Sequence, residues 1–81
     1  MKVEVKLFAV AKQLARAESI TIELFAGATV RDLRDAIGKQ HTELRDITAR
    51  AMIAINTEYA SDNASVPVNC EIALIPPVSG G

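Results

Sequence analysis

The sequence predicts an α+β domain in which a mixed sheet of four or five strands is covered on one face by one main helix. Two observations lead to this prediction. Strand-like stretches occupy both ends of the chain, because residues 2–8 and 19–25 alternate between apolar and polar side chains and residues 71–75 contain an apolar run. Between them, apolar residues after Thr29 recur at spacings of three and four, which indicates one amphipathic helix. The apolar faces of helix and sheet must be buried against each other.

The composition excludes several functions. The chain has 81 residues, the size of one small domain, and a formal net charge of −1. That balance provides no basic surface for nucleic acid. A single cysteine rules out an internal disulfide framework and favours a reducing compartment. One histidine and one cysteine argue against a transition-metal cluster and leave few candidates for a catalytic base or thiol nucleophile.

No membrane segment is expected. The longest continuous apolar stretches, residues 7–11 and 51–55, are far shorter than the roughly 20 residues that span a bilayer. Residues 1–7 alternate between charged and apolar side chains and therefore lack the apolar centre of a signal peptide. We therefore expect a cytoplasmic protein.

The first part of the chain is expected to form two antiparallel strands joined by a short helix. Residues 2–8 alternate, with the apolar residues on one face and the charged residues on the other. Residues 9–17 are rich in helix formers, and residues 19–25 alternate again. The connection is too long for a tight hairpin turn, so a helical connection between antiparallel neighbours fits better.

The main helix is expected to begin after Thr29, a typical N-cap residue. Asp32 follows three positions later, where a carboxylate favours the positive end of the helix dipole. Gly38 weakens a helix interior by about 1 kcal/mol relative to alanine, so we expect the helix to fray there.

Further strands are expected at residues 52–56, around Tyr59 after a turn, and at residues 71–75. The last of these is apolar on both faces, which is typical of a central strand. Between residues 42 and 50 the pattern indicates only a second short turn. This order of elements corresponds to the ubiquitin-like β-grasp fold for residues 1–75, followed by an extended C-terminal tail at residues 76–81.

The side chains that often carry chemistry have structural interpretations. His41 lies near the expected end of the main helix, where a cation is favourable. Cys70 precedes the last strand and is expected to be a small core or edge residue. Asp32 and Asp35 alternate with arginines, which indicates a solvated charged face. Asp62 is expected in a turn for backbone reasons.

The tail is the feature whose composition predicts a function. Pro76 ends the last strand because it cannot donate to a sheet ladder, and the two prolines favour extended chain. Six extended residues span roughly 20 Å. Gly80 and Gly81 lack Cβ atoms, so the tip can enter a narrow channel. The α-carboxylate of Gly81 would then be open to activation by an enzyme. A frayed tail without function is the alternative.

The ending from Ile75 to Gly81 resembles that of the small, sulfur-carrying subunit of molybdopterin synthase, the MoaD-type family. The proline pair with the terminal glycines is the specific part. The resemblance covers the whole chain and includes Leu7-Phe8-Ala9 with Lys12, Thr29-Val30 with Leu33, Ala54-Ile55-Asn56 and Glu71-Ile72-Ala73. The family usually has Gly-Asp directly before the acidic residue that corresponds to Glu71, whereas this chain has Asn69-Cys70 there, in an expected turn.

The resemblance implies that Gly81 carries the chemistry. A partner adenylating enzyme, MoeB-type and E1-like, would use ATP and Mg²⁺ to convert its carboxylate into an acyl-adenylate. A sulfur donor would then give a thiocarboxylate, which delivers sulfur to the pyranopterin precursor in the large synthase subunit. No cofactor is expected on the carrier itself, and two carriers are expected with two large subunits in a heterotetramer.

The resemblance also suggests contacts. The tail residues expected to insert into the large subunit are Pro76, Pro77, Val78, Ser79 and Gly80. Phe8 and Ile75 are expected to contribute to an apolar patch beside the tail, where a partner docks. For Phe8, a plain core position is the alternative.

Three other functions stay open on the sequence. One is a sulfur carrier for another pathway such as thiamine biosynthesis, which shares the fold and the glycines but not usually the Pro-Pro-Val-Ser lead. Another is a ubiquitin-like protein modifier, in which Gly81 becomes amide-linked to a lysine. The third is a β-grasp interaction module whose tail has no role.

Overall fold

The computed structural model describes residues 1–77. In chain order the elements are β1 (Lys2–Leu7), α1 (Ala9–Ala15), β2 (Ser19–Glu23), α2 (Val30–Gln40), the 3₁₀ helix η1 (Thr42–Leu44), α3 (Arg45–Arg50), β3 (Met52–Ile55), β4 (Glu58–Tyr59) and β5 (Ile72–Ile75).

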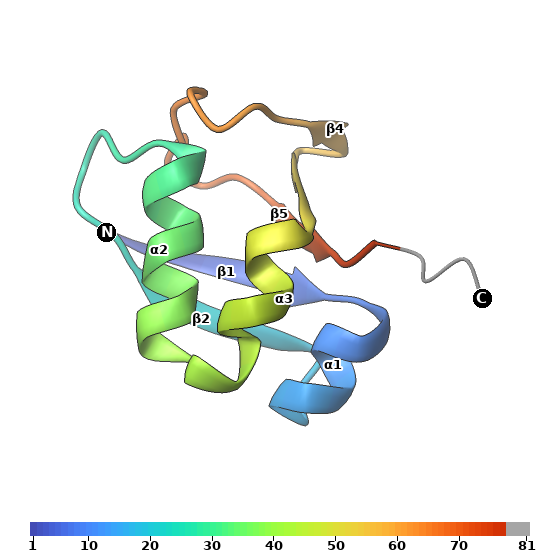
Figure 1. Ribbon diagram of the computed structural model, residues 1–81. Helices are drawn as coiled ribbons and strands as arrows, with labels where there is room; N and C mark the ends of the chain where they lie inside the picture. The colour runs from blue at the N-terminus through green and yellow to red at the C-terminus, as the bar shows by residue number, and fades with distance from the viewer. Residues whose placement is uncertain (78–81) are drawn as a thin grey trace.

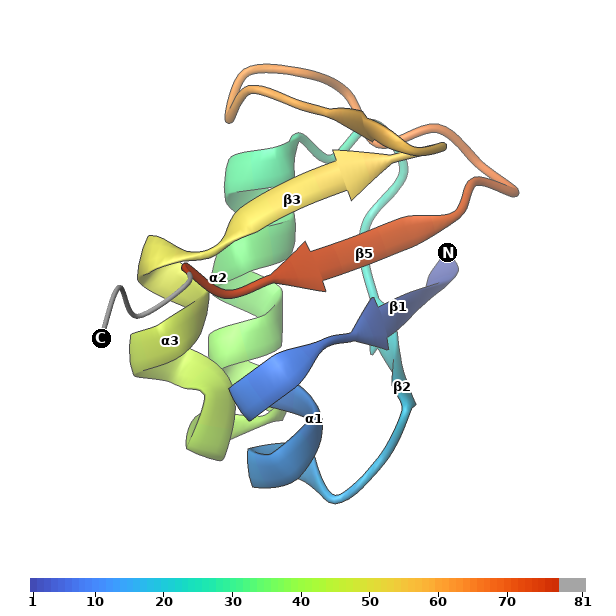
Figure 2. The same ribbon diagram turned by 90° about the vertical axis from the view of Figure 1, so that its right-hand side faces the viewer.

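The five strands form one mixed sheet in the order β2-β1-β5-β3-β4. β1 runs parallel to β5 and antiparallel to β2, and β3 is antiparallel to both β5 and β4. The helices lie on one face of this sheet (Figures 1 and 2). The predicted β-grasp arrangement and the central position of the last strand are therefore confirmed.

The core lies between the sheet and the helices. The alternation in β1 buries Val3, Val5 and Leu7 and exposes the charged residues between them. Leu33 and Ile37 on α2 and Leu74 on β5 are fully buried in the same cluster. The apolar stripes found in the sequence are thus the surfaces that hold the two layers together.

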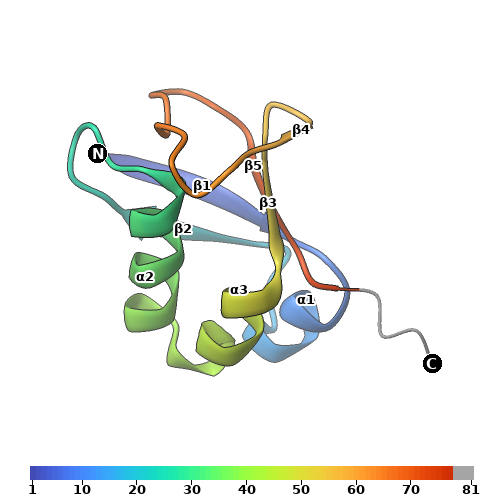
Figure 3. The ribbon, with the colours of Figure 1, turned by 45° about the horizontal axis from the view of Figure 1, so that its top comes forward.

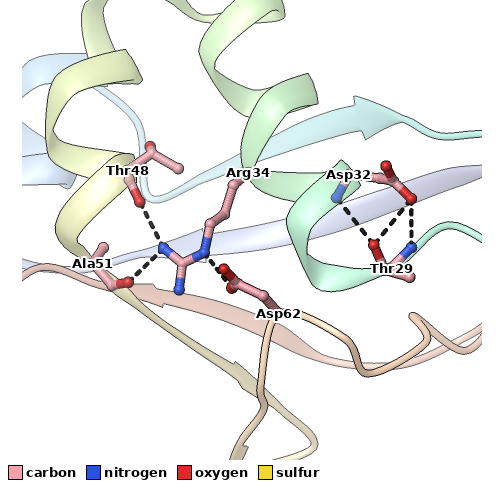
Figure 4. Close-up of polar contacts among 6 residues, drawn as sticks. All are labelled: Thr29, Asp32, Arg34, Thr48, Ala51 and Asp62. Atoms are coloured by element: carbon pink, nitrogen blue, oxygen red, sulfur yellow. Dashed lines mark hydrogen bonds and ion pairs between the residues drawn. The ribbon is translucent and has the colours of Figure 1, made fainter.

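The start of α2 is the one predicted from Thr29 and Asp32. Thr29 Oγ1 accepts a hydrogen bond from the backbone N–H of Asp32 at 3.3 Å, and Asp32 Oδ2 accepts one from the backbone N–H of Thr29 at 2.9 Å (Figure 4). Each side chain therefore satisfies a backbone donor that the helix leaves unpaired.

The prediction that the helix frays at Gly38 is wrong. α2 continues to Gln40, and Gly38 is buried. A Cβ atom at this position would lie 3.0 Å from Cγ of Arg45. The glycine therefore serves close packing of the two helical segments. Residues 42–50 also contain more structure than the expected short turn, because they form η1 and α3.

The expected solvated charged face on α2 is wrong for Arg34. Its side chain is only 19% exposed and its Nε donates to Asp62 Oδ1 at 2.9 Å. Nη1 donates to the backbone oxygens of Thr48 at 2.7 Å and Ala51 at 2.6 Å (Figure 4). Asp62 is thus more than a turn residue. Its contact with Arg34 links α2 to the loop after β4, and the other contacts of Arg34 link α2 to the end of α3.

Candidate functional site

The tail begins at the end of the sheet that lies near α1. β5 ends at Ile75, as predicted, and its end lies near α1 and away from the N-terminus (Figure 3). Pro76 is buried and Pro77 is exposed. The predictions for Val78, Ser79, Gly80 and Gly81 fall on residues outside those that the structure describes.

An apolar pocket of about 360 Å³ adjoins the end of β5. Its lining residues are Phe8, Ala54, Thr57, Tyr59, Ala73 and Ile75. Phe8 is 46% exposed and Tyr59 is 67% exposed, so the pocket belongs to the surface, and the alternative of Phe8 as a core residue is wrong. The structure therefore brings Phe8 and Ile75 into one apolar surface, here called the sheet pocket.

The strand register explains why these two residues meet. The parallel pairing of β1 with β5 sets Lys6 opposite Ala73 and Leu7 opposite Leu74. Leu7 and Leu74 are buried under the helices, so the alternation turns Lys6, Ala73 and Ile75 to the other face of the sheet. Phe8 follows β1 next to Ile75, and both side chains reach the face that the helices leave uncovered.

Besides Ala73 on β5, three lining residues of the sheet pocket, Ala54, Thr57 and Tyr59, were not predicted as site residues. They come from the β3–β4 hairpin, in which Ala54 pairs with Tyr59. Asn56 and Thr57 form its two-residue turn with positive φ angles of 50° and 70°. The expected turn after β3 could have identified them, because a two-residue turn reverses the chain and places Tyr59 beside Ala54 of β3.

Ion pairs lie around the apolar centre. Lys6 and Glu71 are 3.7 Å apart and line a small adjoining pocket with Phe8. Lys12 and Glu18 are 3.3 Å apart and line another pocket on the other side of Phe8. An apolar centre with a charged, exposed rim is the usual composition of a protein–protein interface. The sheet pocket and the ion pairs around it have this composition.

The titratable side chains named in the sequence have structural surroundings. Cys70 is half-buried and its Sγ lies 3.1 Å from the backbone oxygen of Pro67. Burial raises the pKa of this thiol, while a backbone hydrogen bond lowers it less. His41 follows the last residue of α2, with Nδ1 3.5 Å from Glu43 Oε2. Within residues 1–77, no group of three or more histidine, cysteine, aspartate or glutamate side chains is placed to hold a metal ion.

The helices of residues 1–77 do not include one long and apolar enough to cross a membrane.

The mixed sheet, the helices on one face and the tail after the central strand define a ubiquitin-like β-grasp protein. The sequence matches the ThiS family over residues 5–81. The chain belongs to this family, and the family resemblance seen in the sequence is confirmed.

Relatives and solved structures agree with this assignment. The molybdopterin synthase sulfur carrier subunit of Arabidopsis thaliana is 32% identical over 81 residues, which is 100% of this chain and 84% of the relative. The crystal structure of SAMP1 from Haloferax volcanii superposes with a TM-score of 0.85 at 29% identity and covers 100% of both chains. A chain in the complex of subunits 1 and 2 of the molybdopterin-converting factor from Helicobacter pylori gives a TM-score of 0.68 at 29% identity, also over 100% of both chains.

Proposed function

We propose that this chain is the sulfur carrier of a molybdopterin synthase, working in the cytoplasm. The observation that carries the proposal is the Gly80-Gly81 pair of the sequence, which comes after Pro76 and Pro77 at the end of the central strand. The last residue of that strand, Ile75, lines an exposed apolar pocket. The 32% identity to a molybdopterin synthase sulfur carrier subunit over the whole chain supports it.

The chemistry begins with activation of the Gly81 carboxylate. A carboxylate is a poor electrophile, so a partner adenylating enzyme would use ATP and Mg²⁺ to form an acyl-adenylate and release pyrophosphate. A sulfide equivalent from the donor then attacks the acyl carbon and displaces AMP, which leaves a thiocarboxylate on Gly81. In the large subunit the thiocarboxylate sulfur would attack a carbon of the pyranopterin precursor and displace an oxygen substituent from it. Water would then cleave the acyl–sulfur bond, which restores the Gly81 carboxylate and leaves the sulfur on the pterin.

In this scheme the chain provides docking and reach, while its partners provide the catalytic groups. The sheet pocket would be covered by the large subunit, because exposed aromatic residues in an apolar depression are typical binding anchors. Pro77 and the residues after it would then enter the active site of the partner. The Helicobacter pylori chain of similar sequence, which forms a complex with subunit 2, supports such a partner. We extend the proposal to an assembly of two carriers and two large subunits.

A protein-modifier function is the second candidate. The fold superposes on SAMP1 with a TM-score of 0.85, and a related crystal structure is that of a small archaeal modifier protein. The same activated Gly81 would then react with a lysine amine to form an isopeptide bond. The two functions differ in the nucleophile that attacks the activated carbonyl carbon of Gly81, which is a sulfide equivalent in one case and a lysine amine in the other.

The deciding experiment is mass spectrometry of the full chain after incubation with its cognate adenylating enzyme, ATP, Mg²⁺ and a sulfur donor. We expect one carboxylate oxygen in the C-terminal peptide to be replaced by sulfur. Oxidation of a methionine or of Cys70 changes the mass by nearly the same amount, so the change must be located by peptide mapping. A chain without Gly81 is the control, and it should fold normally and gain no sulfur.

Adding the cognate large subunit and the pterin precursor completes the test. Loss of the sulfur from the C-terminal peptide together with formation of a dithiolene product supports the synthase function. Isopeptide-linked adducts without sulfur transfer would support the modifier function instead. Absence of any change in the C-terminal peptide under these conditions would contradict both.

A further inference from the structure

A groove of about 730 Å³ lies between α2 and α3. Its charged lining residues are Arg31, Arg34, Asp35, Lys39, Arg45 and Asp62. The two helices run side by side in front of the sheet in Figure 1, so the groove is on the side of the molecule opposite the sheet pocket. It gathers four basic side chains in a chain whose formal net charge is −1.

Arg34 is held in place at this groove and still has donors to offer. Its Nε and Nη1 are used by Asp62, Thr48 and Ala51. Its second terminal nitrogen, Nη2, makes no hydrogen bond within residues 1–77, and Figure 4 draws no contact from it to the other labelled residues. Because the guanidinium is already fixed, the Arg34 side chain loses little further conformational entropy when a ligand binds Nη2.

Arg45 is held by its contact with Gly38. The position of a Cβ atom on Gly38 lies 3.0 Å from Cγ of Arg45 and 3.4 Å from its Cβ. The aliphatic stem of Arg45 therefore packs directly on the backbone of α2 at the groove. A glycine in a helix interior lowers helix stability by about 1 kcal/mol relative to alanine. The close contact with Arg45 explains why a glycine is present at this position despite that cost.

The remaining charges leave an excess of positive potential. Arg34 and Asp62 neutralise each other. Within the described part of the chain no salt bridge involves Arg31, Lys39 or Arg45, and all three residues are exposed. Asp35 is the one further carboxylate of the lining. Three basic side chains thus face solvent against one acidic side chain.

We propose that this groove binds a carboxylate-rich segment of a partner protein. A guanidinium matches a carboxylate with paired hydrogen bonds, and the spare Nη2 of Arg34 supplies a fixed anchor for one. The volume lies in the range that holds several side chains rather than a single small anion. Asp35 and Asp62 would repel a uniform polyanion such as nucleic acid, whereas a protein segment can place its own basic or neutral residues beside them.

This inference goes beyond the proposed function and is independent of it. A protein that docks through the sheet pocket leaves the helical side of the carrier free. The two surfaces can therefore be occupied at the same time, and binding at the groove can be measured without sulfur transfer.

The test is an NMR titration of the ¹⁵N-labelled full chain with an acidic peptide in which glutamates alternate with glycines, at low ionic strength. We expect the largest amide shifts at Gly38 and Ala49, which line the groove, and small shifts at Ala54 and Ala73 in the sheet pocket. The groove variant R31E/K39E/R45E should weaken binding by about tenfold or more, since each reversed charge removes a favourable pair. The Kd of the native chain should also rise with salt.

The matched control is K2E/K6E/K12E, which reverses three exposed basic residues outside the groove. It has the same net charge as the groove variant. When the variants are compared at about 0.15 M salt, where the Debye length is about 8 Å, this control should change the Kd by less than about threefold, because its reversed charges are then screened from the groove. Lys39→Glu alone provides a second variant if the triple one does not fold. Equal weakening by both triple variants would overturn the proposal, as would a lack of groove shifts at millimolar peptide. Tighter binding of inorganic phosphate or of a single-stranded oligonucleotide would also overturn it.

Discussion

Phe8 and Ile75 line the same surface pocket although they come from opposite ends of the chain. The parallel pairing of β1 with β5 brings them together. Ile75 is also the last residue of β5, so the residue that lines the pocket is the one that precedes the tail. In the proposed function, a partner that covers the sheet pocket would therefore also contact the residue from which the tail starts, and docking and tail insertion would be one binding event.

Replacing Phe8 should weaken docking without unfolding the domain. Phe8→Ser removes a half-exposed aromatic ring from the sheet pocket, and we expect the affinity for the cognate large subunit to fall by about tenfold or more. Phe25→Ser is the matched control, because Phe25 is 64% exposed and does not line this pocket. Isothermal titration calorimetry gives both values. Equal losses in the two variants would refute the role of the sheet pocket.

Removing the Arg34 side chain should destabilise the fold more than removing an exposed lysine. Arg34→Ala leaves Asp62 and two backbone carbonyl oxygens without their donor, and we expect a loss of about 2 kcal/mol in the free energy of unfolding. Lys2→Ala breaks an ion pair whose side chains are 71% and 70% exposed, and should cost less than about 1 kcal/mol. Urea unfolding measures both. Similar small losses would mean that the Arg34 contacts contribute little.

The sequence predicted those features that depend on neighbouring residues. The N-cap at Thr29 follows from Asp32 three positions later, and the buried face of β1 follows from alternation along the strand. The role of Arg34 could not be predicted, because its partners Thr48 and Ala51 come near it only after the chain has folded. α3 was not predicted because its buried residue is a threonine, Thr48, so residues 42–50 lack the apolar spacing that is typical of an amphipathic helix.

Gly38 and Arg45 should be energetically coupled. Alanine is a better helix former than glycine by about 1 kcal/mol, but a Cβ on Gly38 would press on the Arg45 stem at 3.0 Å. We therefore expect Gly38→Ala to bring little or no stability in the native chain, and about 1 kcal/mol in the Arg45→Ala background. A double-mutant cycle measured by urea unfolding tests this. The same gain in both backgrounds would show that the contact is not a constraint.

The turn between β3 and β4 should be stabilised by glycine. Thr57 has a φ of 70°, which is unfavourable for a β-branched residue, and the second position of this turn favours glycine. We expect Thr57→Gly to raise the free energy of unfolding by about 0.5–1 kcal/mol, after the entropy cost of glycine is subtracted. Thr21→Gly, in the middle of β2, should have the opposite sign. A loss of stability in Thr57→Gly would contradict the assigned turn geometry.

Cys70 should be dispensable for sulfur transfer. Burial raises the pKa of its thiol above the ordinary value of 9.0, so the reactive thiolate is disfavoured near neutral pH. Because the folded state holds the proton more tightly than the unfolded state, the stability linked to this proton is present below pH 9 and is lost as the pH rises through the folded pKa.

Two measurements check this expectation. The rate at which iodoacetamide alkylates the folded native chain should increase with pH with a midpoint above 9.0. Cys70→Ser should gain sulfur in its C-terminal peptide as fast as the native chain and should lose less stability at alkaline pH. A variant that folds but no longer accepts sulfur would show that the thiol takes part in the reaction, and the assignment of the chemistry to Gly81 alone would then fail.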